Sequence, residues 1–383
     1  MHKCLEEEIR DRLDTKRLDQ HAGSSSGCIS KGHCYTIDND EMIFVKTNSS
    51  LNASVMLDGE LESLKAIAST RTIRVPKPLF VVHDHDKNRS SSLVVEYLEL
   101  KTLADECAVD LGRSLAHLHD YNNKVLRFNK RASSWIGHKP PSAREIIASK
   151  GKNSSYEASN DPDDADSIQI AKHNFSVKND HLSYPVANLY PDKFVPEPGS
   201  REINQFGFDV PTSCGSIPQC NEWTEDWVSF FARYRLDKPI QSILFDHGDR
   251  ELMQNWSQLQ LKIDKFFVDY PSGSDTDKIV PALLHGDLWS GNVAQLSDAS
   301  RAVVYDPSSF YGHSEYDFAI ARMFGGLPKL FETTYFELIP KKKLFEQRNK
   351  LYQLFHHLNH WEHFGSGYRP SSLRLIKELN TII

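Results

Sequence analysis

The sequence lacks the features that mark exported, membrane-spanning and disulfide-stabilised proteins. Its six cysteines are scattered and include no Cys-x-x-Cys pair, so they indicate neither a zinc site nor a disulfide framework. Residues 1–8 contain no apolar core of a signal peptide, and no apolar run approaches the length of a membrane span. We therefore expect a cytoplasmic protein in a reducing compartment.

An excess of positive charge is also missing. The formal net charge is -7 over 383 residues, which argues against general binding to nucleic acid or to an anionic membrane. The hydrophobic content of 39% and the charged content of 25% are those of an ordinary globular protein. The length suffices for two domains or for one two-lobed unit.

The most informative segment is residues 284–292, with the sequence Leu-His-Gly-Asp-Leu-Trp-Ser-Gly-Asn. An apolar run at 279–284 leads into it and is typical of a buried strand. A second apolar run, 302–305, follows and ends in Asp306. The pattern predicts a tight polar loop between two strands, with one further carboxylate at the end of the second strand.

These side chains are the ones that phosphoryl transfer requires. Asp287 can accept the proton of an attacking hydroxyl, while Asn292 and Asp306 can hold Mg²⁺ on the phosphates of ATP. The spacing from Asp287 to Asn292 matches the protein-kinase catalytic loop, with His285-Gly286-Asp287 where that loop has His-Arg-Asp. The alternative is an Asp/Asn-rich turn of an unrelated fold, and the flanking strands together with Asp306 argue against it.

The N-terminal part has the elements expected of a nucleotide site. A small-residue loop at 23–30, with Gly23, Gly27 and Cys28, can lie over phosphates because little blocks approach to its backbone N–H groups, although an ordinary hairpin turn is the alternative. Lys46 closes an apolar strand, where a kinase has its phosphate-binding lysine. The amphipathic helix expected at 53–69 carries Glu60, our candidate ion-pair partner for Lys46, with Glu62 as second choice.

The next strand, 92–98, ends in a backbone from Glu96 to Leu98 that would suit hydrogen bonding to an adenine edge. A helix expected at 103–119 begins a second lobe. We therefore expect a nucleotide-binding N-lobe at residues 1–98 and a C-lobe at 99–383 that carries catalysis and substrate binding. Residues 122–203 are rich in Asn, Ser, Asp, Lys and Pro without sustained apolar periodicity, which predicts a mostly disordered insertion.

Five segments give the chain a resemblance to the fructosamine/ketosamine-3-kinase family. They are 284–294, 305–315, Asn221-Glu222-Trp223, Phe324-Gly325-Gly326 and Leu358-Asn359-His360-Trp361. The resemblance implies an α+β, two-lobed protein-kinase-like fold with a small β-rich N-lobe and a larger helical C-lobe. It also implies ATP- and Mg²⁺-dependent phosphorylation of the sugar 3-hydroxyl of fructosamine or ribulosamine adducts on protein lysines, which leads to deglycation and protein repair.

By motif match the same resemblance makes Asp287 the base, Asn292 and Asp306 the magnesium ligands, Lys46 the phosphate lysine and Glu60 its partner. Two departures stand out. Residues 24–26 are serines where the family is expected to have more glycine, and the insertion is longer than expected.

The acceptor should be compact, because Glu315 follows Asp306 within nine residues, which leaves no room for a peptide-binding activation segment. A ketosamine is a polyol with a cationic amine, and candidates to bind it are His313, Glu315, Asp317 and the flat walls of Trp223 and Trp289. His313 and Glu315 could equally be a structural pair that braces the loop. The partners are thus glycated protein lysines or small ketosamines, and the preference among fructosamines, ribulosamines and psicosamines stays open.

Cys28 follows Gly27 in the loop expected over the phosphates. Backbone N–H groups and Lys46 would lower the pKa of its thiol and raise its reactivity, which predicts a redox switch in a monomer that can form a disulfide-linked dimer. The alternative is a small apolar residue tucked under the loop.

Two other functions remain open at this point. One is a kinase of the same fold acting on a free metabolite such as an aminoglycoside or choline. The other is a catalytically silent pseudokinase that serves as a binding module, against which the presence of Lys46, Asp287, Asn292 and Asp306 argues.

Overall fold

The computed structural model of the protein describes residues 5–21, 25–26, 30–84, 90–133, 194–197, 199–270 and 278–382. The chain divides into two compact units, Met1–Val125 with Glu197–Ile383, and Leu126–Pro196. In the second unit the described residues are the last turns of one helix and residues 194–196. Most of the predicted insertion, along with Gly23, Gly27 and Cys28, lies outside the described residues.

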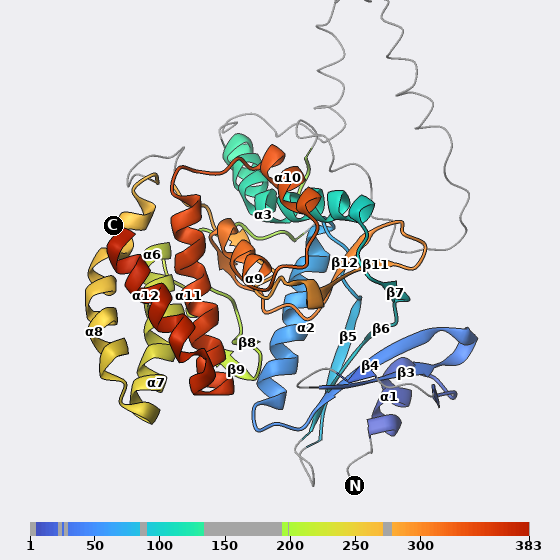
Figure 1. Cartoon of the computed structure of the whole chain (residues 1–383). Coiled ribbons are helices and arrows are strands. Elements are labelled where there is room, and N and C mark those ends of the chain that lie inside the picture. Colours follow the sequence, from blue (N-terminus) through green and yellow to red (C-terminus); the bar gives the residue numbers. More distant parts are fainter. Residues whose placement is uncertain are drawn as a thin grey trace, which may run out of the picture. The chain divides into compact units, whose positions relative to one another are not determined.

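An antiparallel sheet forms the N-terminal part of the first unit (Figure 1). Its strands are β1 (Asp19–Gln20), β2 (Ser25–Ser26), β3 (Lys31–Thr36), β4 (Met42–Asn48), β5 (Pro78–His83) and β6 (Ser91–Glu96). Their order is β1-β3-β4-β6-β5, and β2 pairs with β3. Strand β4 therefore lies inside the sheet, where Lys46 pairs with Gly32 on one side and Leu93 on the other.

Two helices cover apolar residues of this part. Helix α1 (Leu5–Leu13) buries Ile9 in a cluster with Ile43 and Val45 of β4. Helix α2 (Ala53–Thr70), predicted at 53–69, runs between β4 and β5 and buries an apolar stripe with helical spacing. Because side chains alternate along a strand, the burial of Ile43 and Val45 on one face directs Lys46 to the other.

The C-terminal part is mostly helical (Figure 1). Its helices are α3 (Asp105–Ser133), α6 (Trp227–Phe230), α7 (Lys238–His247), α8 (Arg250–Leu259), α9 (Asp317–Phe324), α10 (Lys329–Leu338), α11 (Phe345–Phe364) and α12 (Arg369–Ile382). Its strands are β7 (Leu100–Lys101), β8 (Thr212–Cys214), β9 (Ile217–Gln219), β10 (Ala282–Leu283), β11 (Val293–Leu296), β12 (Ala302–Val304) and β13 (Tyr311–Gly312). An antiparallel sheet followed by a larger helical part confirms the predicted α+β class.

The first helix of this part is longer than predicted. Helix α3 was expected at 103–119, with the insertion starting at 122, but it continues to Ser133. Val125 is buried, and the buried side chain of Asn122 donates hydrogen bonds to the carbonyl oxygens of Ile203 (2.8 Å) and Pro281 (2.7 Å). The predicted boundary was wrong because the helical spacing of buried residues continues through Leu118, Tyr121 and Val125, while the polar residues between them resemble the composition of the insertion.

Burial explains why the remaining helices assemble. The rings of Trp227, Phe231, Tyr352 and Trp361 lie in one large core cluster that joins α6, α11 and α12. Trp227 stacks on Phe231 with ring centroids 5.6 Å apart. Aromatic side chains supply large buried areas, and the cluster also contains Ala282 of β10 and Phe310, which precedes β13. The cluster therefore supports these two strands. Among the helices described, none is long and apolar enough to cross a membrane.

Candidate active site

The loop that follows β10 is shaped by glycine. Gly286 has φ +85°, and a Cβ at this position would lie 1.9 Å from the carbonyl oxygen of Ser308. No other residue could bring these two backbones so close. The buried side chains of Leu284 and Leu288 anchor the loop on either side. This explains why a glycine stands where protein kinases carry arginine.

Asp317 holds the loop from below. Its carboxylate accepts hydrogen bonds from the backbone N–H groups of His285 and Gly286, each at 2.8 Å, and lies 3.1 Å from Nε2 of His119. Burial opposes ionisation, but the interactions with His119, His285 and Gly286 outweigh it, so the pKa of Asp317 lies below its usual value. With 0% exposure, Asp317 is committed to the protein's interior, which disfavours the predicted contact with substrate.

Asp287 and Asn292 meet across the loop. The amide nitrogen Nδ2 of Asn292 donates to Oδ2 of Asp287 at 3.1 Å and to the carbonyl oxygen of Asp287 at 2.9 Å. Because its nitrogen is used in this way, the amide oxygen of Asn292 is the atom left for a cation. Burial, followed by the negative charge of Asp306, raises the pKa of Asp287 to about 7, although the hydrogen bond from Asn292 opposes the shift.

The second carboxylate brings the two parts of the chain together. Asp306 lies 3.0 Å from Nζ of Lys46, and the same ammonium group lies 2.8 Å from Oε2 of Glu60. Burial lowers the pKa of Lys46, but the charges of Asp306 and Glu60 raise it by more, so the lysine remains cationic. Asp306 has φ +55° and a side chain that is 46% exposed, so its carboxylate remains accessible. Glu62, the second-choice partner, is instead paired with Lys65.

Two tryptophans predicted as substrate walls lie in different settings. Trp289 follows Asp287 in the loop, contacts Phe324 with ring centroids 5.5 Å apart and is partly exposed. A Cβ at position 291 would lie 2.3 Å from the Trp289 ring, so Gly291 leaves the space that the ring fills. Trp223 is also partly exposed and packs at 6.0 Å from the ring of Tyr311.

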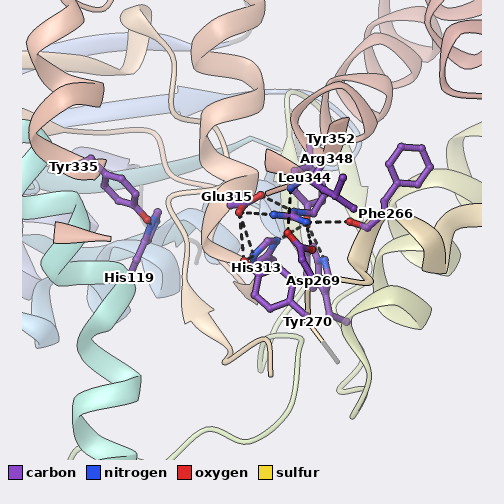
Figure 2. Close-up of polar contacts among 11 residues, drawn as sticks. His119, Phe266, Asp269, Tyr270, His313, Glu315, Tyr335, Leu344, Arg348 and Tyr352 are labelled. Carbon is purple, nitrogen blue, oxygen red and sulfur yellow. Dashed lines mark hydrogen bonds and ion pairs between the residues drawn. The ribbon is translucent and has the colours of Figure 1, made fainter. Parts of the chain in front are cut away.

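The predicted polar substrate residues His313 and Glu315 belong to a buried network (Figure 2). Arg348 on α11 donates to both oxygens of Glu315, at 2.7 and 2.9 Å, and to Asp269 at 2.5 Å. His313 shares hydrogen bonds with the hydroxyls of Tyr352 (2.6 Å) and Tyr270 (3.0 Å). Burial, followed by Arg348, lowers the pKa of His313, which keeps it neutral. Of the two interpretations of His313 and Glu315, this geometry favours the bracing of the loop.

The expected adenine segment lies at the end of β6. The side chain of Glu96 is held by Arg74 at 2.6 Å and by the backbone N–H of Lys77 at 2.7 Å. Residues 97–99 lie outside any strand, before β7 pairs with β11. The Glu96 side chain is thus fixed to the protein, and the backbone N–H groups of Glu96 and Tyr97 donate to the carbonyl oxygens of Lys77 (3.0 Å) and Met42 (3.2 Å). A base could therefore meet the carbonyl oxygens of this segment or the N–H group of Leu98.

Two residues of structural importance were missed by sequence reasoning. His119 supports Asp317, and Arg348 anchors Glu315. A charged or polar residue inside a helical pattern was the available signal, but nothing in the local sequence names its distant partner. Asn221 stood out only as part of a family segment, and its link between the buried Arg235 and strand β8 was not foreseen. Gly286 could have been recognised, since glycine beside a catalytic aspartate indicates close backbone approach.

The cluster brings together the accessible carboxylate of Asp306, the carboxyl group of Asp287 with its raised pKa, the amide oxygen of Asn292 and the ammonium group of Lys46. Within the residues that the structure describes, no three His, Cys, Asp or Glu side chains form a metal-binding group on their own. A hard cation at Asn292 and Asp306 would take further oxygen ligands from elsewhere, as Mg²⁺ does when it is shared with nucleotide phosphates. The residues therefore fit a magnesium–nucleotide complex.

Comparisons with known proteins agree with this geometry. The chain is 38% identical over 377 residues to the ketosamine-3-kinase of Mus musculus, covering 98% of this chain and all of that protein. It is 30% identical to the chloroplastic protein-ribulosamine 3-kinase of Oryza sativa subsp. indica, covering 92% of this chain and 76% of the relative.

Solved structures show the same fold at lower identity. A crystal structure assigned as a fructosamine-3-kinase from Thermobifida fusca superposes with a TM-score of 0.63 at 18% identity, covering 98% of each chain. An aminoglycoside phosphotransferase bound to ADP and hygromycin B gives a TM-score of 0.51 at 13% identity, covering 99% of this chain and 98% of that one. The family described as fructosamine kinase matches residues 1–144 and 181–381, and the chain belongs to that family.

Proposed function

We propose that the protein transfers the terminal phosphoryl group of ATP to the 3-hydroxyl of a ketosamine, a fructosamine or ribulosamine adduct on a protein lysine. The observation that carries the proposal is the meeting of Asp287, Asn292, Asp306, Lys46 and Glu60 in one cluster. The kinship with a mouse ketosamine-3-kinase over nearly the whole chain supports the acceptor class. Phosphorylated ketosamines are unstable, so the reaction would remove the adduct and repair the protein.

In this proposal Asp287 accepts the proton of the acceptor hydroxyl. Its pKa of about 7 suits a base that must take up a proton near neutral pH. Lys46 contacts the nucleotide phosphates, and Glu60 orients Lys46. Asn292 and Asp306 would hold Mg²⁺, which when bound neutralises charge on the phosphates.

Residues 1–98 would thus form the nucleotide-binding lobe and residues 99–383 the catalytic one. The adenine would meet the backbone between Glu96 and Leu98. The short connection from Asp306 to Glu315 is pinned by Arg348 inside the protein, which leaves no segment to hold an extended peptide. A compact sugar adduct, bordered by Trp289 and Trp223, fits this arrangement.

The test incubates purified protein with ATP, Mg²⁺ and one acceptor at a time. The acceptors are the fructosamine, ribulosamine and psicosamine adducts of lysine, and choline and an aminoglycoside represent the alternative substrate classes. Formation of a 3-phosphate on at least one ketosamine, seen by phosphorus NMR, is the expected result. Turnover of choline or the aminoglycoside with none on any ketosamine would replace the proposal with a metabolite kinase. Binding of ATP without turnover of any acceptor would favour the pseudokinase.

A further inference from the structure

The Lys46–Glu60 contact depends on the position of helix α2. In kinases this ion pair must be in place for catalysis, and movement of the helix is a common means of control. Two contacts hold α2 near Glu60. The Ser63 hydroxyl donates to the carbonyl oxygen of Gly59 at 2.6 Å and accepts from the backbone N–H of Ser309 at 3.0 Å. The second contact involves the hairpin formed by β8 and β9.

The hairpin, Thr212–Gln219, packs directly against the turn of α2 that carries Glu60. A Cβ on Gly59 would lie 2.6 Å from the carbonyl oxygen of Pro211 and 3.0 Å from Cα of Thr212. At the start of α2, Nδ2 of Asn52 lies 3.4 Å from the carbonyl oxygen of Ser216 at the hairpin tip. The helix therefore rests on hairpin backbone along the two turns that precede Glu60.

The base of the hairpin is fixed by Asn221. Its Nδ2 donates to Oγ1 of Thr212 at 2.9 Å and to the carbonyl oxygen of Val210 at 3.0 Å. Its oxygen accepts from Arg235 at 2.6 Å. Arg235 is fully buried, and its guanidinium lies 4.2 Å from the centroid of the Phe310 ring. Asn221 thus ties the hairpin to the helical core.

The tip of the hairpin is fixed by α11. Nδ2 of Asn359 lies 3.3 Å from the carbonyl oxygen of Cys214, and Nε2 of His363 accepts from the backbone N–H of Ser216 at 2.8 Å. Asn221 and Asn359 belong to two of the segments that carry the family resemblance, Asn221-Glu222-Trp223 and Leu358-Asn359-His360-Trp361. Neither asparagine has a part in the proposed chemistry, and both hold the hairpin.

We propose that the β8–β9 hairpin is a fixed brace that holds Glu60 against Lys46, with Asn221 and Asn359 as positioning residues. The brace makes the ion pair a permanent feature, so the enzyme needs no phosphorylation or partner to set α2. The inference rests on the proposed function only in assigning Lys46 to the nucleotide phosphates.

The test compares two helical glycines that each face a backbone carbonyl. Gly59→Ala adds a methyl group 2.6 Å from Pro211, and Gly112→Ala adds one 2.4 Å from the carbonyl oxygen of Phe331, away from Lys46. Helix propensity alone would make both changes favourable. We expect Gly59→Ala to weaken Mg·ATP binding, measured by titration calorimetry, about tenfold, as for loss of a charged hydrogen bond. Gly112→Ala should lower the melting temperature while leaving the ATP affinity of the folded protein unchanged.

A double-mutant cycle separates positioning from general damage. In a Glu60→Gln background the ion pair is already lost, so Gly59→Ala should weaken ATP binding by much less than it does alone. If Gly59→Ala does not fold, Asn359→Leu takes its place, because it removes the side-chain hydrogen bonds to Cys214. This variant should raise the KM for ATP more than the KM for the acceptor. Three outcomes would overturn the proposal. The first is wild-type ATP affinity in Gly59→Ala or, if that variant does not fold, in Asn359→Leu. The others are equally weakened ATP binding in Gly112→Ala and additive effects in the cycle. ATP binding needs no acceptor, so failure of the ketosamine assignment would leave this result readable.

Discussion

The charged clusters around Arg348 and around Lys46 differ in how completely their charges are paired within the protein. Around Arg348 the guanidinium is 0% exposed and is held by Glu315, Asp269 and a backbone carbonyl. Around Lys46 one ammonium group contacts two carboxylates, Glu60 and Asp306, and Asp306 is 46% exposed. The nearby Asp287 has a raised pKa. The first arrangement needs nothing more and can only support structure. The second is incomplete, and a cation and a nucleotide would complete it.

The largest effect is expected when the reactive carboxylate of the incomplete cluster is neutralised. Asp287→Asn should lower kcat by about 10²–10⁴, because a positioned base is lost while the hydrogen bond to Asn292 can be kept in a new form. Affinity for ADP and the melting temperature serve as controls, and neither should fall. Turnover close to wild type in the purified variant would remove Asp287 as the base.

A substitution in the fully paired cluster around Arg348 should instead lower the free energy of unfolding. Arg348→Met leaves Glu315 and Asp269 without their buried cation, which is expected to cost about 3–5 kcal/mol in the free energy of unfolding. Arg322→Met is the matched control, since Arg322 also contacts two glutamates, Glu332 and Glu346, but nearer the surface, and it should cost under about 1 kcal/mol. Stability is measured by urea unfolding and by melting temperature. An equal loss of stability in the two variants would show that the difference in burial does not change the contribution of these ion pairs to the free energy of unfolding.

Removing the accessible carboxylate should affect the cation more than the fold. Asp306→Asn keeps a residue that tolerates the left-handed backbone. The factor by which Mg²⁺ tightens ATP binding should be about 10–100-fold smaller in this variant than in wild type. Titrations of ATP with and without Mg²⁺ measure this. If Mg²⁺ tightened ATP binding in the variant as strongly as in wild type, the cation would have to be held elsewhere.

A smaller effect is expected from pH. Burial and Asp306 raise the pKa of Asp287 to about 7, so the basic form of Asp287 in the free enzyme appears only as pH rises through that value. The kcat/KM should fall about tenfold for each unit below pH 6. For stability the sign is opposite: ionising Asp287 costs free energy in the folded state, so Asp287→Asn should raise the melting temperature most above pH 7 and little near pH 4. A flat profile of kcat/KM between pH 5 and 8 would contradict the raised pKa.

The sequence predicted the parts of the site whose signals are local. Asp287, Asn292 and Asp306 follow apolar strands at short spacings, and Lys46 and the helix of Glu60 follow one another within fifteen residues. The buried partners could not be predicted in the same way. Glu315 meets Arg348 across 33 residues and His119 meets Asp317 across 198, and only the packed core decides such pairs.

The same reasoning applies to the polar residues that were candidates to bind the substrate. For Glu315, contact with substrate and bracing of the loop were equal alternatives, and Asp317 was a candidate because it follows Asp306 closely. In the structure both carboxylates are buried. Spacing tells which residues are neighbours along the chain, but the direction in which each side chain points is set by helices α3, α9 and α11 packing around them.

The left-handed backbone of Asp306 restricts which substitutions its position can accept. A φ of +55° is comfortable for glycine and tolerable for asparagine and aspartate, while β-branched residues are strained there. The backbone alone therefore favours glycine, asparagine and aspartate, although Arg71 and Ala299 adopt a similar φ elsewhere in the chain, and a need for negative charge then selects aspartate. In a library of all substitutions, Asn and Gly should be recovered as folded but inactive proteins of nearly wild-type melting temperature, whereas Val and Ile should be inactive and melt at a lower temperature.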